Sequence, residues 1–121
     1  MGKHLDLAIQ VAQLSQKKPR VGCVIVKKRK VISLSCNLTK SHPLQKKLTI
    51  LRFDDEFLDK CKSEQHAEFA AIISIKNKDI LKGASIYIAR LDSEGNTLPG
   101  FPCPACYHLI TKYGIKNIFY T

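Results

Sequence analysis

Two short motifs constrain the fold of this chain more than any other feature. His66-Ala67-Glu68 and Pro102-Cys103-Pro104-Ala105-Cys106 are well separated in the sequence, yet each stands where a helix is expected to begin. The start of a helix offers free N–H groups and the positive end of the helix dipole, which stabilise thiolates and developing negative charge. A histidine, two cysteines and a carboxylate can bind Zn²⁺ and use it. The motifs therefore predict a fold in which the starts of two helices meet.

The spacing within the motifs suits a catalytic zinc site. Cys103 and Cys106 are one helical turn apart, so both sulfur atoms can reach one metal ion at about 2.3 Å. His66 supplies a third ligand from the other helix, which leaves one tetrahedral position for water. Glu68 points away from the ligand direction but can take a proton from that water. H-x-E followed by P-C-x-x-C is typical of zinc deaminases.

A different set of ligands is also conceivable. Cys61, His66, Cys103 and Cys106 together would form a closed structural zinc site with no room for water. That arrangement would leave Glu68 buried beside the metal without a role, and burying an idle carboxylate is costly. We therefore favour the catalytic site.

The length of 121 residues predicts a single domain over residues 1–121, and the order of the expected helices and strands makes it α/β. Apolar residues at helical spacing predict a helix over 4–17, and an almost entirely apolar helix over 65–76 must be buried. The chain between them contains two β-branched runs, which predict a hairpin with a basic tip, and then a long loop. After the buried helix we expect a strand, a helix that starts at Pro104 and is capped by Gly114, and a last strand. The predicted strands are 21–26, 31–35, 84–91 and 115–120, and the loop is 38–63.

Composition excludes several classes of protein. Apolar residues make up 45% and charged residues 25% of the 121 residues, a balance typical of a soluble globular protein. No apolar run reaches the roughly 18 residues that span a bilayer, and the start of the chain does not resemble a secretion signal. We therefore expect a cytoplasmic protein with reduced thiols, in which Cys23 and Cys36 are buried apolar residues.

The positive charge is unevenly distributed along the chain. Residues 1–52 contain 12 Lys or Arg and one acidic residue, whereas residues 53–121 contain 8 Lys or Arg and 9 acidic residues. Such asymmetry indicates a polyanionic partner or a phosphate-bearing substrate, unless the basic face only serves solubility. We expect the hairpin tip at 27–30 to lie at the far end of the sheet from the zinc site. Several cations instead flank the site, and of these we expect Arg20, Lys40 and His42 to contact a phosphate.

The chain resembles the cytidine deaminase-like superfamily, most closely its deoxycytidylate deaminase branch. The resemblance covers residues 4–37 and 63–121, matches both motifs without gaps, and extends to Lys82-Gly83-Ala84-Ser85-Ile86-Tyr87 and Tyr113-Gly114-Ile115-Lys116. It implies a three-layer α-β-α fold with a mixed sheet and the zinc site at the N-termini of two helices. Family domains usually continue with another helix and a fifth strand, whereas this chain stops at Thr121, after the fourth predicted strand. The last strand is then an exposed edge that a neighbouring chain can cover, which predicts a homo-oligomer.

The resemblance also implies roles for individual residues. His66, Cys103 and Cys106 would bind zinc, and Glu68 would carry protons to N3 of a cytosine ring and to its leaving amine, so that ammonia departs and uracil remains. Asn37 resembles the asparagine that binds the sugar in such enzymes. The Ala67 N–H would donate a hydrogen bond to the carbonyl of the base.

Three functions remain open. The favoured one is zinc-dependent hydrolytic deamination of cytosine in a free nucleotide or nucleoside, of the dCMP or deoxycytidine type. The second is deamination of single-stranded nucleic acid or tRNA, which needs stacking aromatic residues, and the basic first half contains none before Phe53. The third is a non-enzymatic zinc module that binds nucleic acid. Preference for cytosine over adenine rests on the resemblance alone.

Overall fold

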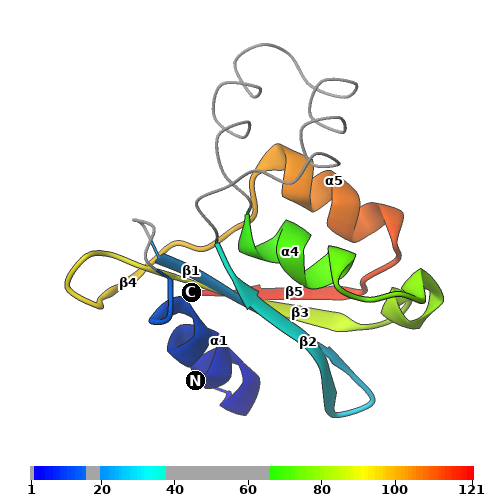
Figure 1. Cartoon of the computed structure of the whole chain (residues 1–121), viewed down its shortest axis with the longest axis horizontal. Coiled ribbons are helices and arrows are strands. Elements are labelled where there is room, and N and C mark those ends of the chain that lie inside the picture. The colour runs from blue at the N-terminus through cyan, green and yellow to red at the C-terminus, as the bar shows by residue number, and fades with distance from the viewer. Residues whose placement is uncertain (1, 16–19, 38–65) are drawn as a thin grey trace.

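The computed structural model describes residues 2–15, 20–37 and 66–121, which form a sheet between two helical layers (Figure 1). Helix α1 (Lys3–Ala12) covers one face of the sheet, and α4 (Ala67–Ile73) and α5 (Pro104–Lys112) cover the other. The predicted three-layer α/β fold is thereby confirmed. The predicted loop 38–63 lies outside the described residues. Within the described part, no helix has the length and apolar character needed to cross a membrane.

The sheet is mixed, as predicted. β1 (Arg20–Lys27) pairs antiparallel with β2 (Lys30–Cys36) on one side and with β3 (Ser85–Leu91) on the other. The second edge of β3 is shared by β5 (Asn117–Tyr120), which runs parallel to it, and by the two-residue antiparallel strand β4 (Thr97–Leu98). The helices therefore connect parallel strands: α4 leads from β2 to β3, and α5 leads from the β3 region to β5.

Alternation along the strands creates two hydrophobic cores. On β1, Cys23 and Ile25 face α4 and α5, whereas Val24 and Val26 face α1. The same period of two separates Ile86 and Ile88 of β3 from its residues on the α1 side. Both faces of β1 and β3 are thus buried, which explains why these strands appear in the sequence as nearly continuous apolar runs.

Gly22 sets the distance between α1 and the sheet. A Cβ atom at this position would lie 2.2 Å from the Ala8 carbonyl oxygen and 2.4 Å from the Ala12 nitrogen. Ala8 and Ala12 are themselves fully buried, so the helix presents its smallest side chains where it approaches β1. The glycine is required by this close approach of two backbones.

The helix ends agree with part of the prediction. Pro104 lies in the first turn of α5, and Gly114 follows its end with φ +77°, so that Ile115 N–H donates to the Ile110 carbonyl at 3.3 Å. α4 is shorter than expected at both ends, and its N-cap is His66. A short 3₁₀ helix, η1 (Lys78–Leu81), follows it and leads into β3.

Candidate active site

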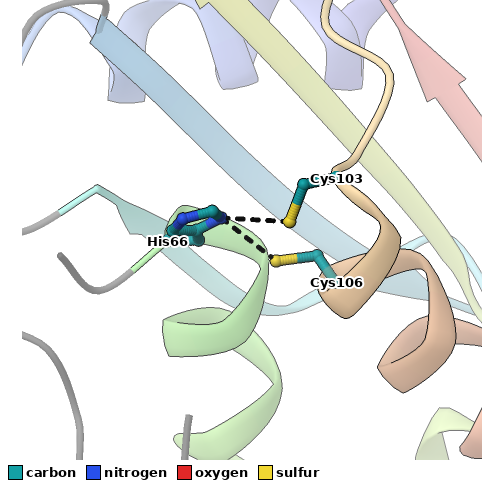
Figure 2. Close-up of side chains that lie close together, drawn as sticks. All are labelled: His66, Cys103 and Cys106. Atoms are coloured by element: carbon teal, nitrogen blue, oxygen red, sulfur yellow. Dashed lines mark hydrogen bonds between the residues drawn. The ribbon is translucent and has the colours of Figure 1, made fainter. Parts of the chain in front are cut away.

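Three potential metal ligands meet at one point between α4 and α5. The Nδ1 atom of His66 lies 3.4 Å from Cys103 Sγ and 3.4 Å from Cys106 Sγ (Figure 2). All three ligand atoms lie within 4.8 Å of one another. With Zn–S about 2.3 Å and Zn–N about 2.0–2.1 Å, a tetrahedral zinc ion separates its sulfur and nitrogen ligands by about 3.5 Å. The donor set and its spacing therefore fit zinc.

The backbone explains how ligands that are distant in sequence come together. His66 is the N-cap of α4, with φ −72° and ψ 149°, and Cys103 is the N-cap of α5, with φ −65° and ψ 163°. Cys106 lies one turn into α5, on the side that faces α4 (Figure 2). Both helix N-termini thus point at the same place, and their dipoles favour thiolate there.

Glu68 lies in the first turn of α4 and is only 5% exposed. Burial raises the pKa of its carboxyl, while the charge of His66 lowers it and the charge of Cys103 raises it again. A hydrogen bond with the Cys106 side chain lowers this pKa further. The carboxyl is therefore close to the three ligands and held in an environment that favours its protonated form. Such a group is suited to accept and return a proton.

Cys23 lies beneath this carboxyl on β1. It is fully buried, and desolvation raises the pKa of its thiol well above the usual value, with a smaller contribution from the Glu68 charge. This agrees with the predicted buried apolar role of Cys23. Cys36 is only partly buried. No disulfide joins the cysteines of the described residues.

Asn37 directly follows β2 and is buried. Its side-chain oxygen accepts hydrogen bonds from Ser15 Oγ at 2.5 Å and from Val21 N–H at 3.0 Å, and its own N–H donates to the Val21 carbonyl at 3.1 Å. These contacts join the end of β2 to β1 and to the chain after α1. The role of Ser15 was not anticipated, because nothing in the sequence indicates which strand end a serine after a helix will meet.

The other predicted contact residues divide into two groups. Ala67 is the first residue of α4 and is fully buried, and Arg20 opens β1, next to the residue that Asn37 binds. The Arg20 Nε atom is buried and makes no hydrogen bond with any residue that the structure describes. Lys40, His42 and Cys61 lie outside the described residues.

Solved structures with the same arrangement of helices and strands identify the class of fold. The dCMP deaminase from the cyanophage S-TIM5 in complex with dCMP and dUMP is 21% identical and has a TM-score of 0.64, over 97% of this chain and 76% of that chain. Its apo form gives the same identity and TM-score over 99% of this chain and 84% of that chain. RibD from Acinetobacter baumannii is 21% identical with a TM-score of 0.57, over 98% of this chain but 27% of that chain. At these identities the likeness shows the fold alone.

The sequence itself decides the family. The model of the cytidine and deoxycytidylate deaminase zinc-binding region matches residues 2–121, so the chain belongs to this family. A search of curated protein sequences finds no match. The resemblance seen in the sequence and the expected zinc cofactor are confirmed by this match together with the cluster of His66, Cys103 and Cys106.

Proposed function

We propose that the chain is a zinc-dependent deaminase that removes the amino group of cytosine by hydrolysis. Its substrate is a free nucleotide or nucleoside of the dCMP or deoxycytidine type. The observation that carries this proposal is the convergence of three metal ligands with the buried carboxyl of Glu68. A structural zinc site needs no such acid beside it. The family match and the likeness to a deaminase that was crystallised with dCMP and dUMP support the choice of reaction.

Each side chain has a distinct task in this proposal. His66, Cys103 and Cys106 would hold a zinc ion, which would supply Lewis acidity and lower the pKa of a water molecule. Glu68 takes the proton from that water and delivers protons to N3 of the base and to the leaving amine.

The substrate contacts are proposed from position. The N–H of Ala67, at the start of α4, donates a hydrogen bond to the carbonyl of the base, and Asn37 binds the sugar. Arg20 is at the same end of the sheet as Asn37, because both flank Val21. Its partly buried guanidinium, with Lys40 and His42, contacts the phosphate. We place the domain, residues 1–121, in the cytoplasm, where cysteine ligands stay reduced.

Substrate choice is tested by measuring ammonia release from a panel of compounds. The purified protein is incubated with dCMP, CMP, deoxycytidine, cytidine, adenosine and a cytosine-containing single-stranded DNA. We expect turnover of a free cytosine nucleotide or nucleoside. Activity on the oligonucleotide alone would overturn the preferred substrate class, and turnover of adenosine alone would overturn the base.

Glu68→Gln tests the role of the carboxyl. The amide keeps the size of the side chain but cannot transfer the proton, so we expect zinc content to stay at one ion per chain while turnover falls by at least about 10²-fold. Zinc content is measured by elemental analysis. Cys61→Ser is the matched control, because it should keep both zinc and turnover. Loss of zinc from Cys61→Ser, with an unaffected Glu68→Gln, would establish a structural four-ligand site instead.

We also propose that the protein forms a homo-oligomer through β5. Within the described residues, β5 pairs with β3 on one side only, and its free edge adjoins exposed aromatic side chains. Phe101 contacts Tyr120 edge to face at 5.2 Å and Tyr107 at 5.5 Å between ring centroids. An unpaired edge beside apolar side chains favours pairing with another strand. Light scattering at micromolar concentration should give more than the mass of one chain.

A further inference from the structure

Basic side chains gather at the end of the sheet opposite the candidate active site. They come from the turn between β1 and β2 (27–30), from the chain after α4 (76–83) and from the end of α5 onward (112–116), which lie at the same end of the molecule in Figure 1. We call this surface the basic pole. Asp79 is the one acidic residue in these three segments. The pole consists of Lys27, Lys28, Arg29, Lys30, Lys76, Lys78, Lys82, Lys112 and Lys116.

Backbone and side-chain contacts hold the three segments together. The Lys27 ammonium donates to the Lys82 carbonyl, which joins the hairpin to the segment before β3. Gly83 N–H donates to the Gly114 carbonyl at 2.8 Å, and Lys116 N–H donates to the Ala84 carbonyl at 2.8 Å. The hairpin tip therefore lies far from the zinc ligands, as predicted, and lysines from the second half of the sequence join it there.

The backbone geometry of the hairpin shows that its turn does not favour Lys28 and Arg29. Lys27 and Lys30 are direct partners, so Lys28 and Arg29 form a two-residue loop, with φ +51° and +67°. Loops of this type favour Asn-Gly, because left-handed φ values strain residues that carry a Cβ. Like charges directly opposite each other, as at Lys27 and Lys30, also destabilise a strand pair. The positive charge is thus placed against the local preferences of the chain.

We propose that the basic pole binds the phosphate backbone of double-stranded nucleic acid. Clustered cations with almost no acidic residue among them complement the regularly spaced phosphates of a duplex. A single strand instead calls for open aromatic faces on which bases stack. Tyr113 is the one aromatic residue in the three segments; it packs against the core, and the Lys112 ammonium lies 5.6 Å above its ring. The pole is a second site that shares no residue with the proposed deaminase site.

The test compares a charge-reduced turn with a charge-matched control. Lys28→Asn with Arg29→Gly removes two cations and supplies the residues that the turn prefers, so this variant should fold at least as well as the unmodified protein. Lys3→Gln with Arg90→Gln removes two cations outside the pole. Binding of 20-base-pair duplexes of DNA and of RNA is followed by fluorescence anisotropy across a salt series.

We expect the logarithm of the duplex affinity to fall linearly with the logarithm of salt concentration. In the turn variant this slope should be smaller by about 2, and affinity at 0.1 M salt should fall about tenfold or more. The control variant should retain most of the affinity and the slope. Binding of either duplex in this pattern supports the proposal, and the two arms identify which nucleic acid binds more tightly.

Four results would overturn the proposal. The first two are the absence of duplex binding at 50 mM salt and equal losses of affinity in the two double variants. The third is tighter binding of the matching single strand that does not change in the turn variant, and the fourth is binding to vesicles of anionic lipid without binding to either duplex. Turnover of free nucleotide is measured in parallel. Because the pole is remote from Glu68, turnover should be the same in the turn variant, so failure of this proposal and failure of the deaminase proposal are distinguishable.

Discussion

Asn37 is fixed by the protein before any ligand binds. Its side-chain oxygen accepts a buried hydrogen bond from Ser15 Oγ and a partly buried one from Val21 N–H. Asn37→Ala removes this acceptor from Val21 N–H, whereas Ser15 Oγ keeps the backbone carbonyl of residue 37, to which it also donates at 3.1 Å. We therefore expect the free energy of unfolding to fall by about 1–3 kcal/mol. Ser15→Ala removes one donor and leaves the acceptor bound to Val21, so it should cost about 0.5–1.5 kcal/mol. Chemical denaturation measures both; equal stability of Asn37→Ala and the unmodified protein would contradict the structural role.

Cys23 makes stability depend on pH in a defined direction. Burial raises the pKa of its thiol well above that of an unfolded cysteine, which is about 8.5. The folded chain therefore keeps the thiol protonated at a pH where the unfolded chain has already released the proton. The stability that this difference provides is fully present below about pH 8.5 and is lost as pH rises further.

Cys23→Ala isolates this effect, because the other titrating groups are shared. The stability of the unmodified protein relative to Cys23→Ala should be constant from pH 7 to 8. Above about pH 8.5 it should decline by about 1.4 kcal/mol per pH unit. Urea denaturation from pH 7 to 10 provides the measurement, and a flat difference across this range would show that the thiol ionises in the folded state.

At the level of single residues, the sequence predicts best where several chemical requirements coincide. His66, Cys103 and Cys106 were expected together, since the type, spacing and helix position of each residue indicated one metal, and the structure brings them together. Ser15 gave no such signal, because a hydroxyl can serve many partners and its partner is 22 residues away. The pattern of apolar residues likewise gave no indication of the side-chain contacts of Asn37 with Ser15 and Val21.

Among the elements, α1 and β1 depend on one close approach. In Gly22→Ala the new Cβ would overlap the backbone of α1 at Ala8 and Ala12, and backbone cannot move aside as a side chain can. We expect unfolding free energy to fall by about 1–3 kcal/mol or more. Gly2→Ala is the matched control, since a Cβ there meets nothing within 4 Å. Equal effects of the two substitutions in thermal or chemical denaturation would show that α1 can shift without cost.

β1, β3 and α5 were predicted within a few residues of their observed ends, whereas the helix predicted over 4–17 ends at Ala12. β1 and β3 stood out as apolar runs because both of their faces are buried, and α5 because Pro104 and Gly114 mark its two ends. β4 was missed, since its two residues follow a polar turn and are held by pairing with Arg90 and Leu91 rather than by their own pattern. Two residues are too few for an alternating pattern to mark a strand in the sequence.

For the whole molecule, folding rearranges the charge that the sequence displays. The second half of the chain, 53–121, has a net charge of −1, which hides the five lysines that it contributes to the basic pole. The acidic residues of the same half are elsewhere in the sequence, and Asp79 alone belongs to the pole segments. The net charge of each half of the sequence therefore underestimated the basic surface around the hairpin tip.

The free edge of β5 provides the last prediction. Thr121 N–H donates to the Ile88 carbonyl of β3, and Asn117 N–H donates to the Ala84 carbonyl just before β3. By alternation, the N–H groups of Ile118 and Tyr120 point away from β3. A second copy that adds its own β5 would use these donors. Tyr120→Pro deletes one of them and should give monomers, whereas Tyr120→Val, which also loses the aromatic ring but keeps the N–H, should still associate.

Light scattering at several micromolar concentrations measures the mass of both variants and of the unmodified protein. Zinc content verifies that each variant is folded, because the three ligands meet only when α4 and α5 are in place. An oligomer that survives Tyr120→Pro unchanged would place the interface elsewhere, and a monomeric unmodified protein would rule it out. If the proline variant becomes monomeric with full turnover, each subunit contains a complete active site; if turnover is lost with the oligomer, the neighbouring subunit completes it.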